Sequence, residues 1–232
     1  ARPILFSGAM VRALLDGRKT QTRRVVKPQT AILTDALARD LGVRPPEQQN
    51  TAVIKCPYGA PGDLLWVRES WQPIWADMDK PPYGLSSPEG WAIKYPATDG
   101  IHEWVNNGGD GKITNACKPS IHMPRWVSRL TLEITNLRVE RLQDISERDA
   151  IAEGILVGEP LPELPDSKGD IYHDGITDQI DGWTRDPAEA YQNLWQAING
   201  IESWRENPWV WVIEFKVHKR NVDDLLRDRG AA

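Results

Sequence analysis

The sequence predicts an α+β protein, a small β-barrel with flanking helices and long loop insertions. Alternating stretches typical of strands recur along the chain, with helical stretches between them. The longest, residues 128–142, keeps a period of two but breaks near Asn136, which is typical of the long, bent strands of small barrels. The chain has 232 residues, of which 40% are hydrophobic, and is therefore long enough to bury a substantial core.

Each expected element has a local signal. Residues 64–71 are the strongest strand prediction, because a nearly continuous apolar run opens them and suggests a central position in a sheet. A first helix has one apolar face and ends at Gly17, a residue that readily adopts positive φ. Ser146 and Asp186-Pro187 are signals for two later helix starts. The expected strands are 3–7, 20–26, 64–71, 91–95, 128–142 and 209–217, and the expected helices are 8–16, 34–41, 146–154 and 186–199.

Tracts rich in proline, glycine and asparagine interrupt these elements. We interpret residues of about 29–60, 73–119 and 156–185 as insertions into one domain that spans 1–220. Within the last insertion, 156–183 is expected to be a loop or lid. The charged tail, 221–232, is expected to fray.

The overall charge limits the class of ligand. With a formal net charge of -5 and a pI of about 5.5, the protein is not a general polyanion binder, so any nucleic-acid contact must come from a local basic patch. A small ligand or a short single strand fits this better than a long duplex. No apolar run approaches the roughly 20 residues of a membrane span, and no signal-peptide pattern is present, so we expect a cytoplasmic protein with no membrane partner.

The cysteines and histidines do not form a pattern that binds metal. Cys56 and Cys117 lie far apart without a CxxC motif, and we expect two free thiols. The four histidines have no HExxH-type spacing. We therefore expect no metal and no cofactor, and the sequence leaves the oligomeric state open.

Tryptophan dominates the aromatic content, with 11 Trp against 2 Phe and 5 Tyr. Trp stacks well on nucleic-acid bases, but it also fills protein cores, and each individual Trp is more often part of a core.

The stretch 14–24 concentrates polar chemistry where a helix, a glycine and a strand meet. Arg18, Lys19, Arg23 and Arg24 create a positive field that attracts anions. A lysine crowded by arginines and partly desolvated is pushed towards its neutral amine, which could accept the proton of Thr20 or Thr22 and make that hydroxyl a nucleophile.

The alternative for the same stretch is a solvated, charged strand face. Lys19 and Thr22 are three positions apart, so in a straight strand their side chains point to opposite faces. They can cooperate only if the chain is still turning at Lys19.

Four separated pieces of the chain carry a resemblance to a known family. An ASCH domain is what four pieces together resemble: the stretch 17–24, the stretch 62–69, the helix 146–154 and the closing strand 210–215. The amino-acid sequence of 120–126 and 207–215 is similar to that of ASCH proteins of bacteriophages and prophages. The resemblance implies a PUA-like β-barrel and a protein that works in a bacterial host cell. It covers the barrel elements and not the long insertions.

The resemblance also implies a candidate site. The family includes an amidohydrolase that removes the acyl group from N4-acetylcytidine, and its Gly-x-Lys-x-x-Thr-x-Arg pattern falls on Gly17, Lys19, Thr22 and Arg24. Thr22 would attack the amide carbonyl, Lys19 would accept and return its proton, and Glu153 would orient or protonate the leaving amine. Arg24 would hold the oxyanion or a phosphate. Glu147 and Glu69 are less favoured alternatives to Glu153, and the further candidate ligand-binding residues are Arg18, Thr20, Trp66, Arg68 and Glu69.

Three functions therefore stay open. The leading one is a protein that binds a nucleobase, a nucleoside or a short RNA or other single strand, with a possible amide hydrolase activity. The second is a non-catalytic RNA-binding or nucleic-acid-binding phage accessory module, and the third is a ribonuclease. These three functions can be distinguished by whether the Glu153 side chain reaches Lys19 and Thr22.

Overall fold

The structure, a computed structural model, describes residues 1–27, 55–75, 91–100, 117–158, 171–175 and 183–230. The expected helix 34–41 and much of the three expected insertions lie outside these residues. The chain forms two compact units, and each draws on separated segments. The first unit holds residues 1–17, 62–133 and 216–232, and the second holds 18–61 and 134–215.

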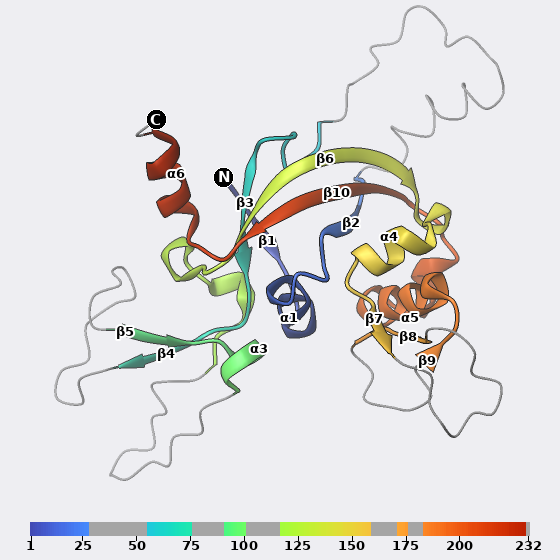
Figure 1. Cartoon of the computed structure of the whole chain (residues 1–232), viewed down its shortest axis with the longest axis horizontal. Helices are drawn as coiled ribbons and strands as arrows, with labels where there is room; N and C mark the ends of the chain where they lie inside the picture. Colours follow the sequence, from blue (N-terminus) through green and yellow to red (C-terminus); the bar gives the residue numbers. More distant parts are fainter. Residues whose placement is uncertain (28–54, 76–90, 101–116, 159–170, 176–182, 231–232) are drawn as a thin grey trace, which may run out of the picture. The chain divides into compact units, whose positions relative to one another are not determined.

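The main sheet has the strand order β1-β3-β6-β10-β2 (Figure 1). β1 runs parallel to β3, β3 pairs antiparallel with the start of β6, and β10 pairs antiparallel with β2. The two longest strands, β6 and β10, each run from one unit into the other. The strands predicted at 3–7, 20–26, 64–71, 128–142 and 209–217 are confirmed, with somewhat different bounds, and with the helices they make the fold α+β. The strand bounds are β1 Arg2–Leu5, β2 Gln21–Val25, β3 Leu64–Arg68, β6 Thr131–Arg141 and β10 Trp209–His218.

The break expected in the long strand lies within β6. Thr135 and Asn136 are both exposed although they are consecutive, so the inside-outside alternation is interrupted there. The Asn136 side-chain carbonyl accepts a hydrogen bond from the backbone N–H of Leu137 at 2.9 Å. The strand nevertheless continues as one element.

In the first unit, α1 (Gly8–Leu15) follows β1 and ends before Gly17, whose φ of +78° confirms the expected helix stop. β4 (Gln72–Trp75) and β5 (Trp91–Lys94) pair antiparallel, and the short helix α3 (Pro96–Asp99) follows. Two 3-10 turns, Ser120–His122 and Arg125–Val127, come next. Trp71, Met123 and Val127 form a buried cluster, and Ile93 and Tyr95 from the expected insertion 73–119 pack against it, so part of that insertion contributes to a core.

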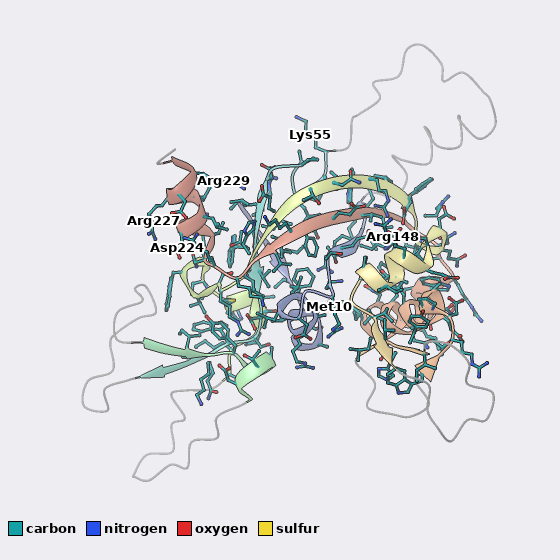
Figure 2. All side chains as sticks on the ribbon, in the orientation of Figure 1. Met10, Lys55, Arg148, Asp224, Arg227 and Arg229 are labelled. Carbon is teal, nitrogen blue, oxygen red and sulfur yellow. The ribbon has the colours of Figure 1, made fainter. Side chains whose placement is uncertain are left out.

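The C-terminal segment is helical, and the expectation that it frays is wrong. α6 (Val222–Gly230) begins at a fully buried Val222 that packs against Leu64 and Trp66. Its charged residues are solvated, and Arg227 forms an ion pair with Asp224 at 2.7 Å (Figure 2). Leu225 packs against the same cluster, and Asp223 and Arg229 form ion pairs with Arg125 and Glu133, so contacts distant in sequence explain why so charged a segment is ordered.

In the second unit, two helices pack against each other beside the ends of β6 and β10 (Figure 1). α4 (Glu147–Ala152) is capped by the Ser146 hydroxyl, which accepts from Asp149 N at 3.2 Å. α5 (Pro187–Asn199) is capped by the Asp186 carboxylate, which accepts from Ala188 N at 2.8 Å. Both sequence-predicted caps are confirmed. Short 3-10 turns follow β6 and α5, at Leu142–Asp144 and Ile201–Trp204.

The region 156–183 is not simply a loop. β7 (Leu156–Gly158), β8 (Ile171–His173) and β9 (Trp183–Thr184) form an antiparallel three-stranded sheet. These strands are two or three residues long, too short for alternation to reveal. Among the described residues, no helix is long and apolar enough to cross a membrane.

Candidate functional site

The cationic segment 18–20 binds the C-terminal end of α4. Thr20 N donates to Ala152 O at 2.9 Å, Lys19 Nζ to Glu153 O at 2.7 Å, and Arg18 Nη1 to Gly154 O at 2.8 Å. The last carbonyls of a helix lack intrahelical donors and carry partial negative charge, so cations are favoured there. The sequence-predicted junction is therefore a helix cap as well as a cluster of cations.

Lys19 and Glu153 form a buried ion pair. Lys19 Nζ lies 2.8 Å from Glu153 Oε2, and the two residues are 0% and 3% exposed. Burial lowers the pKa of the Lys19 amine, and it outweighs the nearby Glu153 carboxylate, which acts to raise it. Arg24 and Arg23 lower the same pKa further. The amine is thus shifted towards the neutral form that a general base requires.

Arg23 binds the other oxygen of the same carboxylate. Its Nη1 lies 3.1 Å from Glu153 Oε1, and its Nη2 contacts Glu140 and lies 3.4 Å from Asp149. The carboxylates raise the pKa of Arg23 against the opposing effect of burial. Its guanidinium lies 5.6 Å from the ring centre of Tyr191, whose own pKa burial raises well above the usual value.

Arg138 and Gln21 extend this cluster along the sheet. Arg138 binds Glu140 at 3.0 Å, Asp149 at 2.7 Å, and Glu214. With its amide oriented to satisfy both neighbours, Gln21 donates to Asp149 Oδ1 at 3.1 Å and accepts from Arg23 Nη1 at 2.6 Å. We call this set the buried network after its buried members Lys19, Arg23 and Glu153, and its partly exposed ionic members are Arg138, Glu140, Asp149 and Glu214.

Thr22 and Arg24 lie on the other face of β2. Side chains alternate along a strand, so Gln21 and Arg23 face α4 whereas Thr22 and Arg24 face away from it. The register with β10 places Ile213 beside Thr22 and Trp211 beside Arg24. Thr22 is buried, and within the described chain no hydrogen bond joins its hydroxyl to the Lys19 amine.

The remaining candidates lie in the first unit or at the surface. Glu69 is 1% exposed and receives two hydrogen bonds from Arg129, each of 2.9 Å. Arg68 lies over the Trp66 ring, 5.3 Å from its centre, and donates to the carbonyl of Ile121. Glu147 is exposed in the first turn of α4. Of the candidate catalytic residues, the structure thus brings together Lys19 and Glu153.

Sequence reasoning did not single out Glu140 and Asp149, and it counted Arg23 only among the cations of the stretch 14–24. Arg23 binds Glu140, Asp149 and Glu153, yet the motif pointed to Arg24 instead. Period two was the available signal, because it places Arg23 with Gln21 on one face and Arg138 with Glu140 on one face of their strand.

Neither the described side chains nor the comparisons add a cofactor or a family. No group of three or more His, Cys, Asp or Glu side chains in the described parts of the chain could hold a metal ion. Comparisons of the chain with protein-family models, curated proteins and solved structures found no match.

Proposed function

We propose that the chain is an ASCH-type protein with a PUA-like barrel that binds a nucleobase, a nucleoside or a short single-stranded nucleic acid. One observation carries the proposal. The lysine and the glutamate that the resemblance pairs are 134 positions apart in the chain, and their side chains meet at 2.8 Å. A pairing expected from the family motif is thus present between two buried residues.

The network supports binding better than catalysis. The Lys19 amine already donates to two oxygens of Glu153, and the Thr22 hydroxyl lies across the strand from Arg23. A nucleophile and its base need a hydrogen bond or one bridging water between them. In this arrangement the network holds β2 against α4, and the half-buried Arg24 on the opposite face of β2 is the candidate ligand-binding residue.

Amide hydrolysis is a second candidate, favoured by the lowered pKa of Lys19 beside a carboxylate. Thr22 Oγ1 would attack the acyl carbonyl of an N4-acylated cytidine and pass its proton to Lys19. That proton would leave on the amine of cytidine, and water would then release the acid from the Thr22 ester. The reaction needs a local shift that brings Lys19 to Thr22.

The test combines calorimetric binding with mass spectrometry on the whole protein. Cytidine, N4-acetylcytidine and a mixed-sequence single-stranded 12-mer are each titrated, and the mixtures are then searched for released cytidine. Saturable binding without turnover is the expected result. Binding by none of the three ligands would overturn the proposal, whereas cytidine release abolished by Thr22→Ala would establish the hydrolase instead.

The control for charge is a variant outside the candidate site. Arg24→Gln removes the candidate phosphate or oxyanion ligand and is expected to weaken binding. Arg205→Gln removes an arginine whose side chain is 80% exposed and which forms a surface ion pair with Glu202. It should bind as the wild type does.

A further inference from the structure

The part of the main sheet that lies in the second unit has one face to which the buried network does not contribute side chains. Arg23 and Arg138 point towards α4, because both bind its Asp149, and their ion pairs with Glu140 and Glu214 place these carboxylates on the same face. By alternation, Arg24 of β2 and Trp211 of β10, which are register partners, point the opposite way. Trp209, the first residue of β10, lies two residues before Trp211 and shares that face by the same alternation. β6 runs beside β10 in the sheet (Figure 1).

An arginine stacks on Trp209. The Arg141 guanidinium, from the end of β6, lies 4.3 Å from the centre of the Trp209 ring. Arg141 Nη1 also donates to the carbonyl of Asn207 at 3.1 Å. The stack is therefore fixed at both ends, by an aromatic ring and by a backbone acceptor.

The Asn207 backbone that holds this stack is itself unusual. Asn207 has a φ of +41°, in the left-handed region that asparagine tolerates better than most residues. Its side chain accepts from Gln143 N at 2.9 Å, and the next carbonyl, Pro208 O, accepts from Leu142 N at 3.0 Å. The turn before β10 is thus tied to the residues after β6, which pre-organises the Arg141 side chain.

Arg141 differs from the cations of the buried network in its partners, an aromatic ring and a backbone carbonyl. In the parts of the chain that the structure describes, no carboxylate lies within ion-pair distance of Arg141. Arg141, Trp209 and Arg24 are all half-buried, so each presents some surface to solvent, and Trp211 is 7% exposed beside them. We call these four residues, Arg24, Arg141, Trp209 and Trp211, the Trp–Arg patch.

We propose that the Trp–Arg patch is a binding site for single-stranded nucleic acid, with bases stacked on Trp209 and the Arg141 guanidinium and phosphates held by Arg141 and Arg24. This inference rests on the proposed function. It selects single-stranded nucleic acid among the proposed ligands and assigns its binding site to these four residues. Aromatic rings and arginines that alternate on one surface match the alternating bases and phosphates of a strand. A duplex hides its base faces, so this surface discriminates against it.

The test measures fluorescence anisotropy of a labelled single-stranded RNA 12-mer and of the matching duplex with the whole protein. Trp209→Leu is expected to weaken single-strand binding about tenfold, because one stacking contact is lost. Arg141→Gln should weaken it and reduce the dependence of affinity on salt by about one phosphate contact. The duplex should bind more weakly than the single strand.

Matched controls separate the patch from general effects. Trp204→Leu changes another half-buried tryptophan of the second unit, and Arg205→Gln changes an exposed arginine in the same turn. Both should bind the strand as the wild type does. Circular dichroism checks that each variant is folded. If Trp209→Leu does not fold, Arg141→Gln, which leaves every aromatic ring in place, still tests the patch.

The outcomes distinguish this inference from the proposed function. If Trp209→Leu and Arg141→Gln bind the single strand as the wild type does, the patch is overturned and the proposed function stands. The same holds if the protein binds nucleosides but no single strand. Displacement by an acidic peptide as readily as by the strand would overturn base stacking. Failure of every nucleoside and strand to bind would overturn both proposals.

Discussion

The Lys19 amine donates to two oxygens of one residue, the side-chain Oε2 of Glu153 at 2.8 Å and its main-chain carbonyl at 2.7 Å. One side chain therefore both ends α4 and neutralises the carboxylate at that end. Because the pair is buried, each charge depends on the other for its stability.

Removing either partner of this pair should destabilise the protein strongly. Lys19→Met and Glu153→Leu each leave a buried charge without its main partner, and each should lower the free energy of unfolding by about 3–5 kcal/mol. Urea denaturation followed by circular dichroism measures it. The double variant should lose less than the sum of the two, and Arg205→Gln, at an exposed pair, should stay within about 0.5 kcal/mol of the wild type. Near-wild-type stability of both single variants would contradict this account.

The lowered pKa of Lys19 makes stability rise with pH. Between the lowered folded pKa and the usual 10.5, the unfolded chain binds a proton that the folded protein does not, so raising the pH favours the folded state. The free energy of unfolding of the wild type should therefore rise relative to that of the Lys19→Met/Glu153→Leu variant as the pH is raised towards 10.5. Urea titrations across this range test it, and a falling difference would show that the pKa is raised instead.

Tyr95 should act in the opposite direction in alkali. Burial raises its pKa from 10.0 to about 12, and its hydroxyl donates to Val127 O at 2.7 Å. Above pH 10 the unfolded tyrosine ionises first, so the stability that Tyr95 contributes is lost between about pH 10 and pH 12. Tyr95→Phe should flatten this loss relative to the wild type. Ultraviolet absorbance titration should also show one fewer late-ionising tyrosine.

Gly158 tests the small sheet of the second unit. A Cβ built at this position would lie 2.5 Å from Cζ3 of Trp183, so Gly158→Ala must displace the indole ring. Overpacking of this kind costs about 1–3 kcal/mol, measurable by urea denaturation. Gly8→Ala is the matched control, because its new Cβ would meet nothing closer than 3.7 Å and it begins a helix. A Gly158→Ala variant as stable as the wild type would contradict the packing of β7 against β9.

Local signals predicted much of the fold, and the failures have a physical cause. Ser146 and Asp186 cap helices through bonds to residues two or three positions away, so a short sequence window contains the whole interaction. α6 was missed because its order depends on Val222 packing against Leu64, a contact that no window contains. β7 to β9 were missed because their stability comes from pairing with one another.

The candidate site likewise has features that the sequence could predict and features that depend on tertiary structure. The pairing of Lys19 with Glu153 came from a family resemblance, since 134 intervening residues hide it from any pattern of spacing. Alternation in β2 did indicate that Arg23 and Arg24 face opposite sides, but only the position of α4 decides which of the two joins the network. The assignment of Arg23, rather than Arg24, to the network therefore needed tertiary structure.

The passage of β6 and β10 through both units has a consequence for synthesis. The second unit needs residues up to 215 and the first also needs residues 216–232, so on a ribosome neither unit is complete before residue 215 has emerged. No single cut between residues can release an intact unit either, because each is assembled from separated segments. Fragments that end within either strand are therefore expected to be aggregation-prone, and the two units to be obtained only together.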